Sequence, residues 1–211
     1  MTDLFLDTLD IKRQEIFFRL KSFSDIGALG GGTAIALQVG HRRSFDFDIS
    51  TNDTLPTTLW SKVRRVFGTG CVKAMETEGQ LDFLTPDNIS VTFFHDDYPF
   101  IFPTLPTETI DLANLKDLAS NKAFVIGRRG KWRDYVDLYF LLTEKYITLK
   151  EIITISLKRS QEEFPIRLFL QQLSYFDDLG NFVIDFMKDE IDPGTIKEYL
   201  VNAVKEFETT L

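Results

Sequence analysis

Two aspartates one residue apart, Asp46 and Asp48, lie in the segment "SFDFDIS". The alternation of polar and apolar residues predicts a β-strand, on which these two side chains share one face. Two neighbouring carboxylates repel each other unless a cation lies between them. Mg²⁺ is typically bound by one or two carboxylates together with waters and substrate phosphate oxygens. The acid pair, Asp46 and Asp48, therefore predicts a site for Mg²⁺, with Mn²⁺ as the second choice.

Three consecutive glycines, Gly30, Gly31 and Gly32, precede this strand, and Thr33 follows them at the start of the apolar segment "TAIALQVG". Glycine lets the backbone approach a ligand closely. The free amides at the start of a helix favour an anion such as phosphate. A glycine turn or an Asp-x-Asp strand is common on its own in proteins without such a ligand. Together, in the order strand, turn, helix and strand, they favour phosphoryl or nucleotidyl transfer.

The elements that must position these residues can be read from the periodicity of apolar side chains. Residues 3–23 and 56–68 predict amphipathic helices, and Gly40 closes a short helix after the glycine turn. Strands are predicted around 71–77, in "QLDFL" and in "ISVTFF". We expect a mixed, mostly antiparallel sheet with helices on one side, ending near Pro106.

From Asp111 onward the sequence is helical. Helical periodicity covers 111–127, 132–145, 148–160, 164–177 and 194–208. The sequence therefore predicts an α+β protein. Its α/β lobe with an N-terminal helix spans 1–106, and its α-helical bundle lobe spans 107–211.

Composition limits the classes of function. The chain has 211 residues and a formal net charge of -8, which argues against a protein whose whole surface binds nucleic acid. A single cysteine, Cys71, cannot form an internal disulfide. We find neither a signal-peptide pattern nor an apolar run long enough to cross a bilayer, so we expect a cytoplasmic protein without a membrane partner.

The segment "LGGGTAIALQVGHRRSFDFDI" resembles the signature of the AbiEii/AbiGii-type nucleotidyltransferases, a branch of the DNA polymerase β-like nucleotidyltransferase superfamily. The glycine turn precedes an Arg-x-Ser-x-Asp-x-Asp strand there, matched here by Arg43, Ser44, Asp46 and Asp48. A second block, "LKDLASNKAFVIGRRGKWRDYVDLYFLL", and the tail "LSYFDDLGNF" are also similar to this family. The residues that match in the second block are Lys122, Arg129, Arg133, Asp134 and Asp137. The resemblance implies the nucleotidyltransferase fold.

The resemblance also implies roles. Asp46 and Asp48 hold Mg²⁺ against the triphosphate of a nucleotide, and the Thr33 hydroxyl contacts its β- or γ-phosphate. Lys122 neutralises phosphate charge or orients the nucleotide, and Asp134 matches a later catalytic aspartate. The remaining nucleotide-binding residues implied are Gly31, Gly32, Arg43, Ser44 and Arg129. Arg129 and Arg133 either steady the substrate or pair with neighbouring acids.

One departure concerns a third carboxylate. Members of the superfamily commonly carry one on a later strand, where this chain has Thr92. Asp82 substitutes for it if its strand lies beside that of the acid pair. Otherwise the chain uses a different base or has lost activity.

The expected function is transfer of a nucleoside monophosphate from a nucleoside triphosphate to a hydroxyl group. The favoured acceptor is the 3′ end of a tRNA, because the clusters 41–43 and 128–133 are basic and Trp132 either stacks on a base or packs between helices. The resemblance further suggests the toxin of a toxin-antitoxin or phage-defence pair, with a separately encoded antitoxin. The alternatives are an enzyme that adenylylates a protein and a nucleotide-binding relative without activity.

Overall fold

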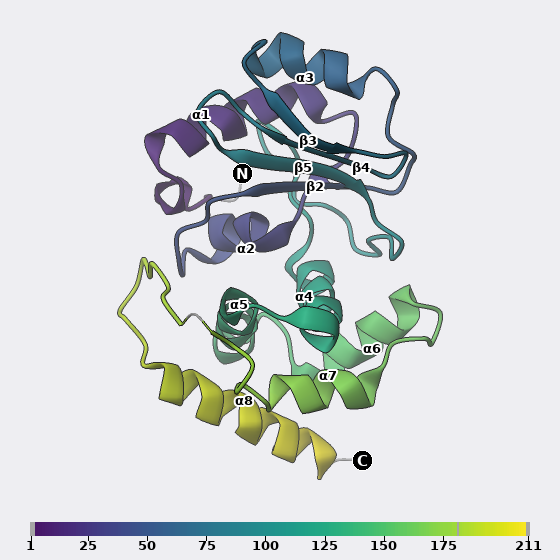
Figure 1. Ribbon diagram of the computed structural model, residues 1–211. Coiled ribbons are helices and arrows are strands. Elements are labelled where there is room, and N and C mark those ends of the chain that lie inside the picture. The colour runs from purple at the N-terminus through teal and green to yellow at the C-terminus, as the bar shows by residue number, and fades with distance from the viewer. Residues whose placement is uncertain (1–2, 181, 210–211) are drawn as a thin grey trace. The chain divides into compact units, whose positions relative to one another are not determined.

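The computed structural model describes residues 3–180 and 182–209, and it divides into two compact units, Met1–Asn114 and Leu115–Leu211 (Figure 1). The first unit contains a five-stranded sheet with helices, and the second is helical. The predicted α+β class is therefore confirmed. Within the described ranges, none of the helices combines the length and the apolar character needed to cross a membrane.

The N-terminal segment is helical in three pieces. A 3₁₀ turn at Leu6–Thr8 comes first, followed by α1, Ile11–Arg19, and a second 3₁₀ turn at Leu20–Phe23. The Asp10 side chain caps α1 by accepting a hydrogen bond from the Arg13 amide at 2.9 Å. The extended backbone at Asp10 interrupts the single helix that the apolar spacing over 3–23 predicts.

The sheet consists of β1, Ala28–Leu29; β2, Phe47–Thr51; β3, Val72–Glu76; β4, Gln80–Leu84; and β5, Ser90–His95. Their spatial order is β1-β2-β5-β4-β3. β2 and β5 are parallel, and the other neighbours are antiparallel. The predicted mixed, mostly antiparallel sheet is therefore confirmed.

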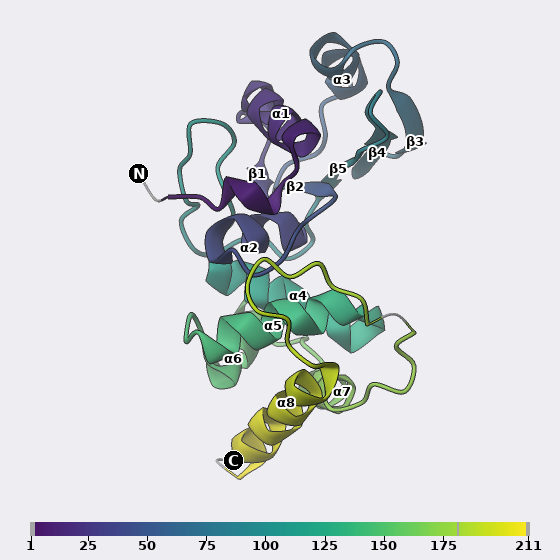
Figure 2. The same ribbon diagram turned by 90° about the vertical axis from the view of Figure 1, so that its left-hand side faces the viewer.

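Helices lie on both sides of this sheet (Figures 1 and 2). On one side are α1 and α3, Leu59–Phe67, and on the other is α2, Gly31–Val39. The side of α3 carries a cluster of packed rings from Phe23, Phe67, Phe83 and Phe93. The expectation of helices on one side only is wrong, because the short helix after the glycine turn packs against the face opposite α3.

The second unit contains α4, Leu115–Arg129; α5, Trp132–Thr143; α6, Leu149–Arg159; α7, Ile166–Leu173; and α8, Pro193–Glu208. Helix α4 contacts α5, α6 and α7, and α8 contacts α5, α6 and α7. The α5 side chains of this core include Tyr135, which is 1% exposed. Burial raises the pKa of Tyr135 to about 12, and its hydroxyl donates to the Gln172 carbonyl.

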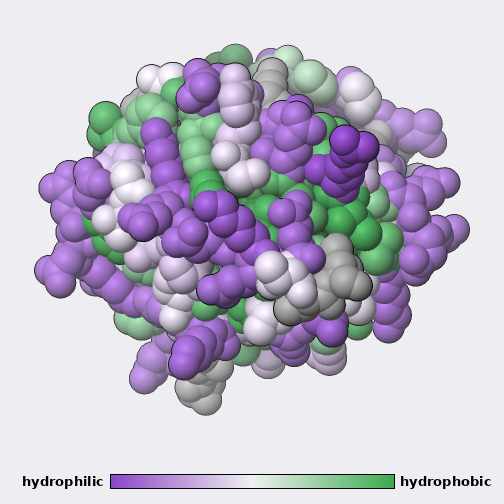
Figure 3. Space-filling model, turned by 90° about the horizontal axis from the view of Figure 1, so that it is seen from below, coloured by the Kyte–Doolittle hydropathy of each residue, from purple (hydrophilic) through white to green (hydrophobic). Residues whose placement is uncertain are grey.

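Apolar side chains also occur at the surface. Val183 and Ile11 are the most exposed of the large hydrophobic residues described. On the face that Figure 3 displays, hydrophilic residues predominate and a hydrophobic area lies to the right of the centre. Some exposed apolar surface is normal for a folded domain and does not by itself define a site.

Candidate nucleotide and metal site

Asp48 lies against the backbone of the glycine turn, Gly30–Gly32. The Gly30 amide donates to the Asp48 carbonyl at 2.7 Å, and Gly31 has the positive φ of +61°. A Cβ atom added at Gly31 would lie 2.2 Å from Asp48 Oδ2. Only glycine fits this close approach, so the turn brings one carboxylate of the acid pair to the start of α2.

The start of α2 offers hydrogen-bond donors next to this carboxylate. Its N-cap, Gly30, has no side chain, and the first amides of an α-helix have no partner within the helix. Gly31, Gly32 and Asp48 are each half-buried and so remain partly accessible. The helix dipole and these amides favour negative charge at this position. The turn therefore has the features of a phosphate-binding bend beside a carboxylate.

Asp46 lies one residue before β2 and is exposed, whereas Asp48 is within the strand. A divalent cation fits this donor set, because Mg²⁺ needs only one or two protein carboxylates and keeps waters and phosphate oxygens as its other ligands. Among residues 3–180 and 182–209, no group of three or more histidine, cysteine, aspartate or glutamate side chains could hold a metal ion. A cation at the acid pair would have waters or substrate oxygens as its other ligands.

The hydroxyls of Thr33 and Ser44 connect α2 to the segment before β2. Their oxygens lie 2.7 Å apart, and the Thr33 hydroxyl also donates to the Asp46 carbonyl. Thr33 is 1% exposed, so its hydroxyl bonds within the protein in this structure. Both hydroxyls position the backbone that carries Asp46, an arrangement that the sequence motif alone does not indicate.

Only part of the basic segment 41–43, which follows α2, is exposed at the surface. His41 and Arg42 are buried, and the Arg42 guanidinium donates to the Arg43 carbonyl at 2.9 Å. Arg43 is exposed. The expected basic cluster 41–43 is therefore wrong for two of its three residues, because the first two side chains fold into the unit. Arg43 remains the accessible cation near the acid pair in sequence.

Thr92 lies next to Asp48 in the sheet, and Asp82 lies next to Thr92. The register pairs Asp48 of β2 with Thr92 of β5, and Thr92 with Asp82 of β4. The condition that the Asp82 strand lies beside the strand of the acid pair is therefore not met, because β5 lies between them. Residues in register share a face of the sheet, so Asp48, Thr92 and Asp82 form a polar row.

In the second unit, Lys122 of α4 faces two carboxylates of α5. Its Nζ lies 2.6 Å from Asp134 Oδ1 and 2.7 Å from Asp137 Oδ2. The side chains of Lys122 and Asp134 are each 9% exposed, and that of Asp137 is 0% exposed. We call these three residues the lysine cluster. It brings together the two catalytic residues predicted from this half of the chain.

Asp134 also has a structural role, because its Oδ2 accepts a hydrogen bond from the Lys131 amide at 2.9 Å and caps α5. Asp137 belongs to the same cluster, although the sequence prediction gave it no catalytic role. Its spacing of three residues from Asp134 on a helix is the signal that places both on one face. The buried Lys122 ammonium and the two carboxylates compensate one another's charges without a bound ligand.

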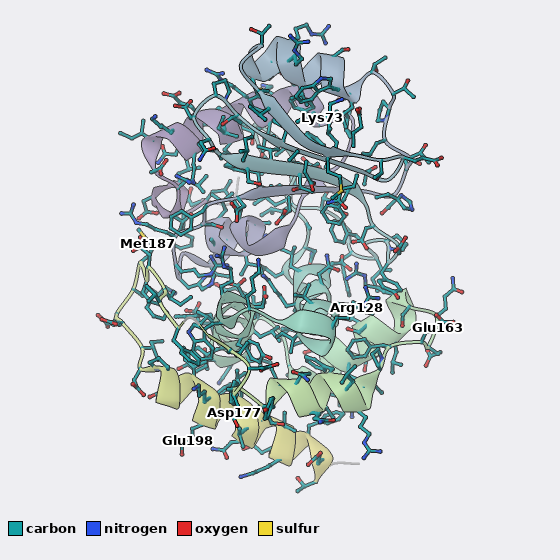
Figure 4. All side chains as sticks on the ribbon, viewed as in Figure 1. Lys73, Arg128, Glu163, Asp177, Met187 and Glu198 are labelled. Atoms are coloured by element: carbon teal, nitrogen blue, oxygen red, sulfur yellow. The ribbon has the colours of Figure 1, made fainter. Side chains whose placement is uncertain are left out.

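The other basic residues of the second unit are distributed differently. Arg128, labelled in Figure 4, is exposed on α4, and Lys131 and Arg133 are exposed at the start of α5. Arg129 ends α4, and its side chain lies outside the part of the chain that the structure describes. Trp132 is buried.

The rings around Trp132 come from Tyr135, Phe176 and Phe182, with centroids 5.0–6.4 Å away. Trp132 therefore packs in the core of the second unit, and the alternative that it stacks on a nucleic-acid base is wrong. The exposed cations next to it, Lys131 and Arg133, line a cavity of about 400 Å³ with residues of the segment after α7.

Several solved structures have a similar fold. The chain matches MenT4, the nucleotidyltransferase toxin Rv2826c from Mycobacterium tuberculosis H37Rv, with a TM-score of 0.63 over 96% of this chain and 83% of that one, at 15% identity. It matches a candidate nucleotidyltransferase from H. pylori with a TM-score of 0.57 and JHP933 from Helicobacter pylori with 0.52, each at 19% identity over 94% of both chains. The chain therefore has the nucleotidyltransferase fold.

A sequence relative places the chain in a family. No family model matches the sequence. The chain is 31% identical over 186 residues to the uncharacterized protein aq_aa25 of Aquifex aeolicus (strain VF5), and the match covers 85% of this chain and 86% of that protein. The chain belongs to the same family as aq_aa25.

Proposed function

We propose that this protein is a Mg²⁺-dependent nucleotidyltransferase that moves a nucleoside monophosphate from a nucleoside triphosphate to a hydroxyl acceptor. The observation that supports this function best is the close approach of the Asp48 carboxylate to Gly31 at the start of α2. In this proposal, the Asp48 carboxylate that binds the metal lies next to the bend at Gly31 that binds phosphate. The nucleotidyltransferase fold supports the same activity.

Asp46 and Asp48 would hold Mg²⁺, which supplies positive charge to the triphosphate when it is bound. The amides of Gly31 and Gly32 bind phosphate oxygens, and Arg43 adds a charged donor from the surface. Thr33 and Ser44 position the acid pair through their hydrogen bonds.

We assign Lys122 to neutralising phosphate charge and Asp134 to the later catalytic carboxylate. The lysine cluster supports this assignment, because two carboxylates keep the Lys122 ammonium charged in a buried position. In this proposal, Lys122 exchanges one carboxylate for a phosphate oxygen when substrate binds.

The acceptor that we favour is the 3′ end of a tRNA. Exposed Arg128, Lys131 and Arg133 offer cations to a phosphate backbone in an otherwise acidic protein. We further propose that the protein is the toxin of a toxin-antitoxin or phage-defence pair with a separate antitoxin protein. The fold shared with MenT4, a nucleotidyltransferase toxin, and the resemblance to AbiEii-type proteins support this role.

The test is a labelling experiment with each of the four α-³²P nucleoside triphosphates, Mg²⁺ and either total tRNA or a protein lysate. We expect label on tRNA with at least one triphosphate, and loss of labelling with EDTA. Label on protein alone would instead support the second candidate, an adenylylating enzyme.

Triphosphate binding without transfer to either polymer would support a catalytically inactive relative. The absence of both binding and transfer would overturn the proposed function. Binding is measured independently of transfer, by calorimetry with each triphosphate in the presence of Mg²⁺ or Mn²⁺.

A further inference from the structure

The segment between α7 and α8 has a defined place against α5 (Figures 1 and 2). The Phe176 and Phe182 rings pack on Trp132, with centroids 6.4 and 5.0 Å away. Further along the segment, the Phe186 ring lies 6.2 Å from that of Phe140. Aromatic pairs at these distances attract each other beyond the burial of their surface. Ring contacts at three places therefore hold the segment along α5.

Lys197 of α8 joins three of these rings into one cluster. Its ammonium nitrogen lies 4.1 Å from the Phe182 centroid. The same nitrogen lies 5.6 Å from the Phe176 centroid and 6.0 Å from that of Trp132. A cation within about 6 Å of an aromatic ring is attracted by the electrons of its face. The cluster thus ties α5, the segment and α8 together, so the segment forms a fixed wall beside α5.

Between this wall and the start of α5 lies the cavity of about 400 Å³, a size typical of ligand pockets. From α5 it is lined by two exposed cations, Lys131 and Arg133. From the segment it is lined by the Asp178 carboxylate and by two apolar side chains, Val183 and Ile184. Val183 is 83% exposed, which is unusual for a large apolar residue in an ordered segment. The cavity therefore combines positive, negative and apolar surface.

A nucleotide carries a group that matches each of these surfaces. Its phosphate can accept charged hydrogen bonds from Lys131 and Arg133. The flat face of its base can cover apolar Val183 and Ile184. The Asp178 carboxylate accepts hydrogen bonds and donates none, so it favours a base with an amino group. Inorganic phosphate, by contrast, would contact the two cations and leave the apolar wall in water.

We propose that this cavity is a second nucleotide site, for a nucleoside 5′-phosphate whose base carries an amino group. The ligand is either a free nucleotide or the last nucleotide of a single strand, because both offer the same phosphate and base edge. The site uses no residue of the acid pair or of the glycine turn. Its binding therefore needs neither Mg²⁺ nor transfer, and the inference goes beyond the proposed function.

The test is calorimetric titration of the full chain in EDTA, which removes any cation from the acid pair. The probes are CMP and UMP, which differ at C4 of the base by an amino group in place of a carbonyl oxygen. We expect CMP to bind about tenfold more tightly, because only its amino group donates to Asp178. Asp178→Ala should abolish this preference. Lys131→Ala combined with Arg133→Ala should weaken the binding of both probes by at least about tenfold.

The hexanucleotide r(UUUUUC) distinguishes the two sources of the ligand. If the site takes the end of a strand, this probe should bind at least about tenfold more tightly than CMP at the same salt concentration. Binding no tighter than that of CMP would assign the site to a free nucleotide. In both cases r(UUUUUU) should bind more weakly than r(UUUUUC).

Lys158→Ala is the matched control, because Lys158 is an exposed cation of α6 that does not line the cavity. Its affinity for CMP should stay within about twofold of that of the unaltered protein. A loss equal to that of the double variant would show that binding follows net charge, and the proposed site would be wrong. Equal binding of CMP and UMP, or binding of neither, would also overturn it. The proposed transfer would be unaffected, because it is measured separately with a triphosphate and Mg²⁺.

Discussion

The two units hold their carboxylates in opposite ways. In the first unit, Asp48 is half-buried at the start of α2, against a backbone whose amides favour negative charge. In the second unit, Asp134 and Asp137 are buried, and Lys122 lies within 2.7 Å of both. The carboxylate in the first unit is partly accessible to solvent, whereas those in the second unit are buried beside a countercharge.

Because of this difference, we expect the carboxylates of the first unit to matter mainly for the free energy of ligand binding and those of the second unit mainly for the free energy of folding. A partly exposed carboxylate is still solvated by water, so under the proposed function its replacement should change mainly binding and transfer. Removing one partner of a buried ion cluster destabilises the fold, because the remaining charges stay buried without compensation. Replacing a charged residue of the lysine cluster should therefore lower the free energy of unfolding more than replacing the acid pair does.

The largest expected effect is on transfer, and it comes from a substitution in the first unit. Replacing Asp46 and Asp48 together with alanine removes both candidate cation ligands, so we expect transfer to fall by at least about 10³-fold, equivalent to about 4 kcal/mol. The midpoint of thermal unfolding should change little, because relief of the mutual repulsion offsets the loss of the favourable position of Asp48 at the start of α2. Transfer that survives this double substitution would rule out the acid pair as the site.

In the second unit, Lys122→Met should lower the free energy of unfolding by about 3–5 kcal/mol, because it leaves two buried carboxylates without their cation. Urea denaturation of the full chain measures this loss. The matched control is Lys116→Met, whose pair with Glu151 is 3.7 Å long and largely exposed, and which should change stability by less than about 1 kcal/mol. Equal effects of the two substitutions would remove the contrast between the units.

Gly31→Ala tests the close contact between the glycine turn and Asp48. The positive φ and the contact with Asp48 should cost about 1–2 kcal/mol of stability, and the displaced carboxylate should weaken Mg²⁺-dependent triphosphate binding. Gly180→Ala is the control, because a Cβ there meets nothing within 4 Å. Calorimetric titration and urea denaturation of both variants measure the two effects. Unchanged binding by Gly31→Ala would contradict the proposed phosphate bend.

The smallest expected effect on stability concerns Glu151, which with Thr148 caps the start of α6 at the surface of the second unit. Hydrogen bonds from the Thr148 amide and hydroxyl lower the pKa of Glu151 below its ordinary 4.5. The stabilisation is therefore present above that value and is lost as the pH falls through the lower pKa of the folded state. Because water screens this side chain, Glu151→Gln should lose only about 0.5 kcal/mol at pH 7.

The difference between Glu151→Gln and the unaltered protein should disappear in acid, below the folded-state pKa of Glu151. Urea denaturation across this pH range measures the difference. A difference that is independent of pH would show that packing, rather than charge, explains the cap.

The sequence predicts the fold well where local signals and tertiary structure agree. Gly40, with φ of +70°, ends α2 as the pattern indicates, and "QLDFL" coincides with β4. The side of the sheet on which α2 packs is not predictable, because it depends on the crossing from β1 to β2. Likewise, no local signal shows that β5 lies between β2 and β4.

For the candidate site, the sequence order places the glycine turn near the acid pair, and the structure shows the contact for Asp48; Asp46 lies outside the strand that the alternation predicted for both. The sequence does not reveal that the Thr33 hydroxyl bonds to Ser44, since the partner of a hydroxyl is set by tertiary packing. Nor does a basic run in the sequence show which cations are accessible. His41 and Arg42 are buried and Arg43 is exposed, a difference that depends on tertiary packing and not on the charge of the run.

The position of β5 also has a consequence for how the chain acquires its final form. The hairpins β3-β4 and β4-β5 join segments that are close in sequence, whereas β2 pairs with β5 across the whole intervening chain. Local pairings close short loops and form early, but distant ones must first overcome a larger loss of chain entropy. We therefore expect a nascent polypeptide to lack the neighbour of Asp48 until β3, β4 and β5 dock onto β2, so that the candidate site is completed late in folding.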